Sequence, residues 1–285
     1  MKSMMMSAVS TKDLQRKAWV LRRRVIEMVG IGKAGHVGGS CSLAEIVAVL
    51  YFSELNIDPA NPQKPDRDRF ILSKGHAALI QYAALAERGY FPIQELARLK
   101  TLGSILQGHP DLTKTPGVEA NTGSLGQGLS IANGIALGAR KGGLGFNIFV
   151  VLGDGEINEG QVWEAAMFTA FHKLDHVIAI LDRNGLQAMG LTKDRLDTDP
   201  LSGKWKSFGW NVIEIDGHDV EQIVSAIREA KEYNGKPNII IARTVKGKGI
   251  SFAENNPAFH NGIMNKEQYD KAIQEIDAAL ATQPC

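Results

Sequence analysis

Two short polar motifs in this chain have the residue types needed to hold a metal ion and a diphosphate together. Gly153-Asp154-Gly155 is followed, after 28 intervening residues, by Asn184. One carboxylate, one amide oxygen and a nearby main-chain carbonyl would suit Mg²⁺, which is commonly held by few protein groups while phosphate oxygens complete its shell. The other interpretation is that both motifs are ordinary turns, and a short glycine-rich motif alone does not decide between the two.

The segments before these motifs are typical of buried parallel strands. Residues 146–152 and 177–181 are almost entirely apolar, so Asp154 and Asn184 each come just after the carboxyl end of a predicted strand. In an open parallel sheet, ligands bind in the crevice outside those ends. We therefore expect the two side chains to direct oxygen atoms toward one point.

Four histidines lie in glycine-rich or loop settings, where a histidine taken singly is usually a surface or hydrogen-bonding residue. They are His36, His76, His109 and His260. Their dispersion, without H-x₃-H spacing or a cysteine pair, argues against zinc. Gathered at the same sheet edge as Asp154, they would suit a site that handles phosphate charge and alcohol protons near neutral pH.

The whole chain alternates between predicted strands and helices, which indicates an α/β fold with a doubly wound, mostly parallel sheet. Strands are expected at 69–72, 146–152, 177–182, 211–215 and 238–243, and helices at 11–29, 43–55, 76–88, 92–102, 126–141, 161–173 and 219–233.

We expect one domain over 1–285, with a flexible segment at 1–10 and a loosely attached C-terminal helix and tail at 265–285. The loops 103–125 and 184–205 are long enough to be functional. On the first helix, Arg22-Arg23-Arg24 is expected to form a solvated or subunit-facing surface.

Composition excludes several classes of protein. The formal charge is +1, so no overall field favours nucleic acid or an anionic membrane. No apolar run reaches the roughly 18 to 20 residues that span a bilayer, and Met4-Met5-Met6 is too short for a signal-peptide core. Cys41, in a predicted turn, and the terminal Cys285 provide no disulfide framework, so a reducing cytoplasm fits best.

Seven motifs, in this order, resemble the N-terminal, cofactor-binding half of transketolase, a thiamine-diphosphate enzyme. The resemblance runs from about Leu14 to Gly262. The motifs are Gly35-His36-Val37-Gly38-Gly39-Ser40, Ser73-Lys74-Gly75-His76-Ala77, Gly108-His109-Pro110-Asp111, Asn121-Thr122-Gly123-Ser124-Leu125-Gly126-Gln127-Gly128, Gly153-Asp154-Gly155-Glu156-Ile157-Asn158-Glu159-Gly160, Asp182-Arg183-Asn184, and Lys246-Gly247-Lys248-Gly249 leading to His260.

The resemblance implies a role for each matching residue. Asp154, Asn184 and the carbonyl of Leu186 would bind Mg²⁺, with Ca²⁺ or Mn²⁺ as alternatives. The residues implied to bind thiamine diphosphate are His76, Gly123, Ser124, Leu125, Gly153, Asp154, Gly155, Glu156, Asn184 and His260. His36, His76 and His109 would act on the sugar, and Glu159 would join a carboxylate network between paired active sites. Glu164 either extends that network or is simply an exposed helix position.

The implied chemistry is transfer of a two-carbon ketol unit from a ketose phosphate to an aldose phosphate, as in the pentose phosphate pathway. In the family, a glutamate from a second domain protonates the cofactor, and that domain usually follows in the same polypeptide. Here we expect it on a separate C-terminal subunit, with two copies of each chain and no activity from this chain alone. We expect no nucleic-acid or membrane partner.

The sequence departs from the pattern of single-chain transketolases in places, and it leaves other functions open. Val-Gly-Gly-Ser follows His36 where single-chain enzymes typically have Pro-Gly-Ala-Pro, and Lys-Gly-Lys-Gly also resembles deoxyxylulose-phosphate synthase. The sugars are therefore undetermined, and deoxyxylulose-phosphate synthesis or 2-oxo-acid decarboxylation are the enzymatic alternatives. A non-catalytic binding protein on the same fold is a third. Dinucleotide binding is weaker, because the glycines after the strand at 146–152 do not form G-x-G-x-x-G.

Overall fold

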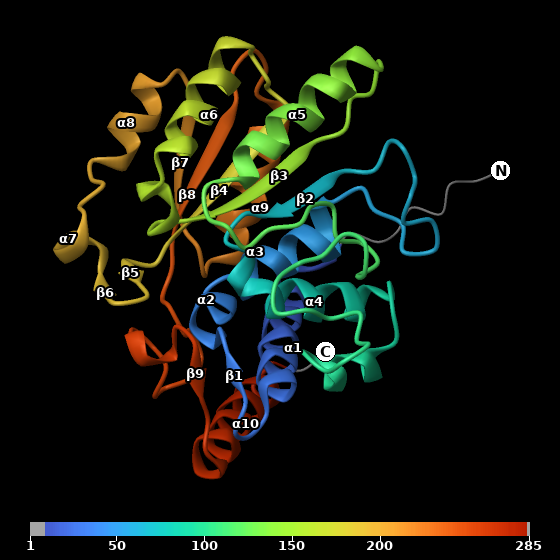
Figure 1. Ribbon diagram of the computed structural model, residues 1–285, viewed down its shortest axis with the longest axis vertical. Coiled ribbons are helices and arrows are strands. Elements are labelled where there is room, and N and C mark those ends of the chain that lie inside the picture. The colour runs from blue at the N-terminus through green and yellow to red at the C-terminus, as the bar shows by residue number, and fades with distance from the viewer. Residues whose placement is uncertain (1–8, 284–285) are drawn as a thin grey trace.

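The fold centres on a five-stranded, entirely parallel sheet, seen in the computed structural model of the chain, which describes residues 9–283 (Figure 1). Its strand order is β2-β3-β4-β8-β7. The strands are β2 (Arg69–Leu72), β3 (Ile148–Gly153), β4 (Val177–Arg183), β7 (Asn211–Asp216) and β8 (Asn238–Arg243). The predicted fold class is confirmed.

Helices cover both faces of the sheet. The helices are α1 (Thr11–Val29), α2 (Val37–Cys41), α3 (Ala44–Val49), α4 (Ala78–Arg88), α5 (Gly128–Lys141), α6 (Gly160–Phe171), α7 (Thr192–Arg195), α8 (Leu201–Ser207), α9 (Val220–Glu232) and α10 (Lys266–Ala281). Alternate strand residues face opposite sides, so Phe149 and Val151 pack with the cluster of α1, α3, α4 and α9, while Val150 and Leu152 pack with that of α5, α6 and α8.

Two short ladders complete the structure. β5 (Leu186–Gln187) and β6 (Gly190–Leu191) form a small hairpin within the long segment 184–205, which also contains α7. β1 (Ala34–Gly35) pairs antiparallel with β9 (Gly262–Ile263), which joins segments near the two ends of the chain (Figure 1). In the described part of the chain, no helix has the length and apolarity needed to cross a membrane.

Several local expectations are corrected. Residues 92–102 contain only a 3₁₀ helix at Ile93–Arg98, and Cys41 ends α2 and is fully buried instead of lying in a turn. Residues 1–8 of the segment expected to be flexible lie outside the described residues, as does Cys285, but Ser10 caps α1.

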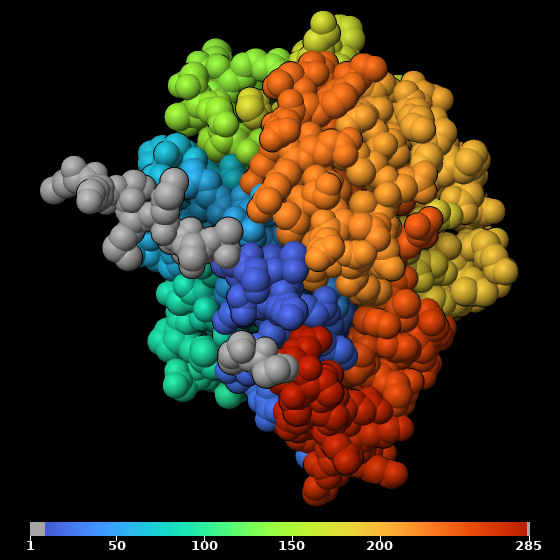
Figure 2. All heavy atoms as spheres, turned by 180° about the vertical axis from the view of Figure 1, so that it is seen from behind, coloured from blue at the N-terminus to red at the C-terminus, as the bar shows by residue number. Residues whose placement is uncertain are grey.

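The C-terminal helix and the arginine cluster also differ from expectation. α10 buries Ala272 and Ile276 in the main core and packs against α1, so it is not loosely attached; the two lie together when the molecule is seen from behind (Figure 2). Arg22 is fully buried, because its guanidinium is paired with Glu45 across the α1–α3 interface. The predicted exposed arginine surface is thus wrong for Arg22.

Candidate active site

The carboxyl ends of β3 and β4 bring the two predicted metal-binding segments together. Gly153 of β3 lies opposite Asp182 of β4. The Asp154 carboxylate accepts hydrogen bonds from the main-chain N–H groups of Gly155 and Gly185, and the Asn184 side-chain oxygen accepts one from Leu186. The predicted convergence of these segments at one sheet edge is therefore observed.

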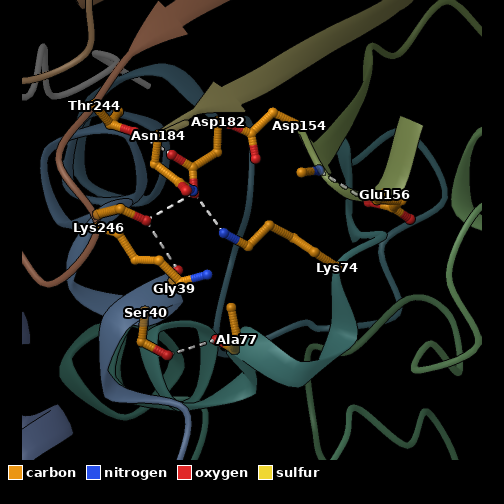
Figure 3. Close-up of polar contacts among 12 residues, drawn as sticks. Gly39, Ser40, Lys74, Ala77, Asp154, Glu156, Asp182, Asn184, Thr244 and Lys246 are labelled. Carbon is orange, nitrogen blue, oxygen red and sulfur yellow. Dashed lines mark hydrogen bonds and ion pairs between the residues drawn. The ribbon is translucent and has the colours of Figure 1, made fainter. Parts of the chain in front are cut away.

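A buried carboxylate that the sequence did not single out organises this edge. Asp182 accepts hydrogen bonds from Ser42 at 2.7 Å and Asn184 at 3.1 Å, from the Thr244 hydroxyl, and from the ammonium of Lys74. Figure 3 shows Lys74, Asn184 and Thr244 gathered around Asp182. Burial alone would raise the pKa of Asp182, but the Lys74 charge and the hydroxyl donors outweigh it and lower that pKa.

The neighbouring Asp154 is in the opposite electrostatic situation. Its burial, together with the Asp182 carboxylate, raises its pKa to about 6. A buried carboxylate beside a second one is stabilised by an added cation. The electrostatic environment of the Asp154 carboxylate thus favours a bound cation at this edge. Within residues 9–283, however, no cluster of three or more His, Cys, Asp or Glu side chains could hold a metal ion.

Lys246 is a second lysine at the same edge. Its ammonium donates to the carbonyl of Leu186 at 2.9 Å and lies 3.0 Å from Nδ1 of His260. Burial and the nearby Lys74 lower its pKa to about 8. The carbonyl expected to bind the metal is thus already in contact with a cationic group.

The four predicted histidines do gather at one place. The ring centroids of His36 and His76 are 5.1 Å apart, those of His76 and His260 are 5.0 Å apart, and His109 lies 6.4 Å from His36. The β1–β9 ladder brings the first and last of them together, since His36 directly follows β1 and His260 precedes β9. Burial and nearby lysines lower the pKa of His36 and of His260 to about 4, and the pKa of His76 is lowered as well. These three rings are neutral at pH 7.

A cavity of about 320 Å³ lies between the Asp154 edge of the sheet and two of the clustered histidines, His76 and His260. It is lined by Lys74, His76, Leu125, Gly153, Asp154, Gly155, Glu156, Asn158, Glu159, Asn184, Leu186, Gln187, Ala188, Lys246 and His260. Two buried polar atoms of this lining, Oδ1 of Asn158 and Nε2 of Gln187, have no hydrogen-bond partner in the protein. Because buried polar atoms are normally satisfied, they suit a polar ligand.

At two glycines near this cavity, an added side chain would meet a neighbouring residue. A Cβ on Gly155 would lie 2.9 Å from the Gln187 side chain. Gly123 has a φ of +148°, and a Cβ there would lie 3.0 Å from the His109 ring. Gly123 therefore requires glycine, which agrees with the close backbone approach expected of a cofactor-binding loop, whereas a side chain at position 155 would displace Gln187.

The three predicted glutamates and Ser124 lie in different environments. The Glu156 carboxylate is occupied by Ser73 and by the main-chain N–H groups of Gly126 and Gly153, so it holds loops in place and has little capacity to contact a cofactor. Glu159, Glu164 and Ser124 are exposed in this chain.

The sequence reasoning missed Lys74 and Asp182, although both lie within motifs of the family resemblance. The available signal was a lysine two residues after an apolar strand, which requires a counter-ion if it is buried.

Comparison with known proteins matches residues 14–279 to the family described as the thiamine diphosphate binding domain of transketolase. The chain belongs to the transketolase family. It is 47% identical over 265 residues to the 6-deoxy-6-sulfo-D-fructose transketolase subunit SqwG of Clostridium sp. (strain MSTE9), covering 93% of this chain and 96% of the relative. It is 45% identical over 269 residues to an apulose-4-phosphate transketolase subunit of Actinobacillus succinogenes, covering 94% and 97%.

A solved transketolase from Campylobacter jejuni has the same fold, with a TM-score of 0.84 and 30% identity. The alignment covers 95% of this chain but only 47% of the Campylobacter protein. The chain therefore spans about half of that transketolase but nearly all of the two subunit relatives. The prediction of an N-terminal, thiamine-diphosphate-binding transketolase subunit is confirmed.

Proposed function

We propose that this chain, as a single domain, supplies the diphosphate-binding half of an enzyme that transfers a two-carbon ketol unit between sugars. The observation that carries the proposal is the cavity shared by Asp154, His76 and His260, with the remaining histidines of the cluster beside it. The cavity suits a metal diphosphate, and the adjoining histidines His36 and His109 suit sugar hydroxyls. A separate C-terminal subunit would complete the site.

The residues present fit thiamine diphosphate with Mg²⁺. Asp154, Asn184 and the Leu186 carbonyl supply the hard oxygen atoms that Mg²⁺ prefers, with Ca²⁺ or Mn²⁺ as alternatives, and His76 and His260 face the diphosphate. Lys246 would share the Leu186 carbonyl with the metal or move toward phosphate oxygens. The bound cofactor supplies an acidic carbon and an electron sink for the bond cleavage.

The histidines would position the sugar and move its protons. Because His36, His76 and His260 are neutral at pH 7, each can donate from one ring nitrogen and accept at the other. We assign His36, His76 and His109 to the hydroxyl groups nearest the reacting carbon atoms. Burial, aided by the nearby lysines, keeps the rings of His36, His76 and His260 neutral, and the lysines favour an anionic substrate.

We place the partner subunit on the exposed face of α5 and α6. Met167 is 52% exposed and Phe171 is 81% exposed, and Phe168 lines a groove between the two helices together with Glu164. Large apolar side chains exposed together are typical of an interface. Glu159, at the start of α6, then lies beside the partner and is available for the predicted carboxylate network, with two copies of each chain in the complex.

The names of two relatives suggest which class of sugar this chain would use as donor. One relative is named for 6-deoxy-6-sulfo-D-fructose and another for apulose 4-phosphate. Both are sugars with an anionic group at the end. We therefore propose a ketose with a terminal sulfonate or phosphate as donor, and xylulose 5-phosphate remains one candidate among these.

The test is ketol transfer by the chain purified from its own host with whatever copurifies, with Mg²⁺ and thiamine diphosphate supplied. Donors are the sulfonated ketose, apulose 4-phosphate, xylulose 5-phosphate and pyruvate, and the chain stripped of partners is the control. Activity only in the copurified sample supports the proposal. Efficient transfer by the stripped chain would refute the need for a partner, turnover of pyruvate alone would refute ketol transfer, and full activity of Asp154→Ala would refute the metal site.

A further inference from the structure

A largely buried chain of polar groups links α1 to the segment that follows β8. Arg22 donates to both carboxylate oxygens of Glu45, at 2.7 and 2.6 Å, and to the carbonyl of Cys41 at 3.2 Å. Glu45 Oε2 lies 3.0 Å from Nδ1 of His218. On the other side of the imidazole, Nε2 accepts a hydrogen bond of 2.8 Å from the main-chain N–H of Val245.

These contacts define the state of the His218 ring. A main-chain N–H can only donate, so Nε2 must be unprotonated and Nδ1 must carry the hydrogen that is directed at Glu45. Although burial would raise the pKa of Glu45, the Arg22 charge and the His218 hydrogen bond lower it to about 2. The carboxylate is thus ionised and fixed by Arg22, and it orients the imidazole.

The amide that His218 holds lies between two residues of the cofactor site. The regular β4–β8 ladder ends at Arg243, so the sheet gives the Val245 amide no partner. Thr244 donates to Asp182, and Lys246 contacts the Leu186 carbonyl and His260. The main chain at Val245 therefore sets where both of those side chains can reach.

We propose that His218, oriented by Glu45 and Arg22, is a positioning residue that fixes the main chain at Val245 and so places Lys246 in the diphosphate-binding site. This positioning role of His218 rests on the proposed function in one respect, since it assumes that the ligand of the site is thiamine diphosphate. His218 itself does not line the cavity, so it acts through Val245 and not on substrate.

Two substitutions separate this role from simple fold stabilisation. In His218→Gln, the longer amide can place its oxygen near the former Nε2 position and still accept from Val245. In His218→Asn, the shorter side chain can still contact Glu45, but its amide cannot reach the former Nε2 position. The main-chain N–H of Val245 is then left without a hydrogen-bond acceptor. His176→Asn, at an exposed histidine near the opposite end of the sheet, is the matched control.

The measurement is calorimetric titration of thiamine diphosphate, with Mg²⁺ present, into the full chain copurified with its partner. We expect His218→Asn to weaken the affinity about tenfold, as loss of one buried hydrogen bond implies, and His218→Gln to stay within about threefold of the wild type. Melting temperatures recorded alongside show whether the two variants differ in stability. Equal affinities for all variants, or equal losses for Asn and Gln, would overturn the positioning role.

A second measurement does not depend on the variants folding. In the wild-type complex, hydrogen exchange of the Val245 amide should be as slow as that of the adjacent β8 amides, because His218 holds it. Fast exchange there would also overturn the proposal. A wild-type complex that binds no thiamine diphosphate would refute the proposed function and this role together, whereas normal wild-type binding with an unaffected His218→Asn refutes only the role.

Discussion

Replacing Lys74 by methionine removes the ammonium group that neutralises the buried Asp182 carboxylate. The two side chains are 2% and 0% exposed, so water cannot take over the lost interaction. Breaking a buried ion pair by removing one partner typically costs about 3–5 kcal/mol. Asp182 keeps hydrogen bonds from Ser42, Thr244 and Asn184, so we expect the lower end, about 3 kcal/mol, as the loss in free energy of unfolding.

The pH dependence of this loss follows from the lowered pKa of Asp182. A carboxyl group whose pKa is lower in the folded state contributes stability above its unfolded pKa of about 3.9 and loses it as pH falls through the folded value. Without Lys74, burial dominates and the folded pKa rises, so protonation at mildly acid pH relieves the unpaired charge. The difference between variant and wild type should therefore be smaller at about pH 5 than at about pH 8.

The assay is urea unfolding of the purified chain at both pH values, followed by tryptophan fluorescence. Lys141→Met, at an exposed position on α5, is the control and should stay within about 0.5 kcal/mol of the wild type. Stability of Lys74→Met within about 1 kcal/mol of the wild type at about pH 8, or a deficit that does not change with pH, would refute the role of Lys74 as counter-ion of Asp182.

Three further predictions concern other groups. Because the pKa of Asp154 is raised to about 6, affinity for Mg²⁺ and thiamine diphosphate should be constant above that pH and fall about tenfold per unit below it, and a flat calorimetric profile from about pH 5 to 8 would contradict this. Gly123→Ala should strain the backbone by about 1–3 kcal/mol and weaken cofactor affinity, while Gly145→Ala, where a Cβ meets nothing within 4 Å, should not. Burial raises the pKa of Cys41 to about 12, so in a Cys285→Ser background a thiol reagent should label the protein only after unfolding; rapid labelling of the native chain would contradict this.

The sheet and the meeting of Asp154 and Asn184 at one of its edges were predictable because the signals are local. The apolar runs before Gly153 and Asn184 mark β3 and β4, and parallel strands place their carboxyl ends together without further information. The histidine cluster required the family resemblance as well, because no local pattern brings His36 near His260.

Long-range pairings of charged groups were not predictable from local patterns. Helical spacing from Ala18 and Val25 places Arg22 on the buried face of α1, unlike Arg23 and Arg24. Its partner Glu45, however, lies on another helix and cannot be identified from this spacing. In the same way, the sequence correctly places Asp182 at the end of a strand, but it does not show that Asp182 is the buried counter-ion of Lys74. Such pairs depend on which helices and strands come to pack together.

The short β1–β9 ladder has a consequence for how the protein is made. The segments flanking His36 and His260 pair across almost the whole length of the chain, so the histidine cluster is complete only after the C-terminal region has left the ribosome and docked. An incomplete or prematurely released chain can form helices and strands but has no finished site. The histidine cluster therefore cannot assemble until residues 260–263 have been synthesised and β9 can pair with β1.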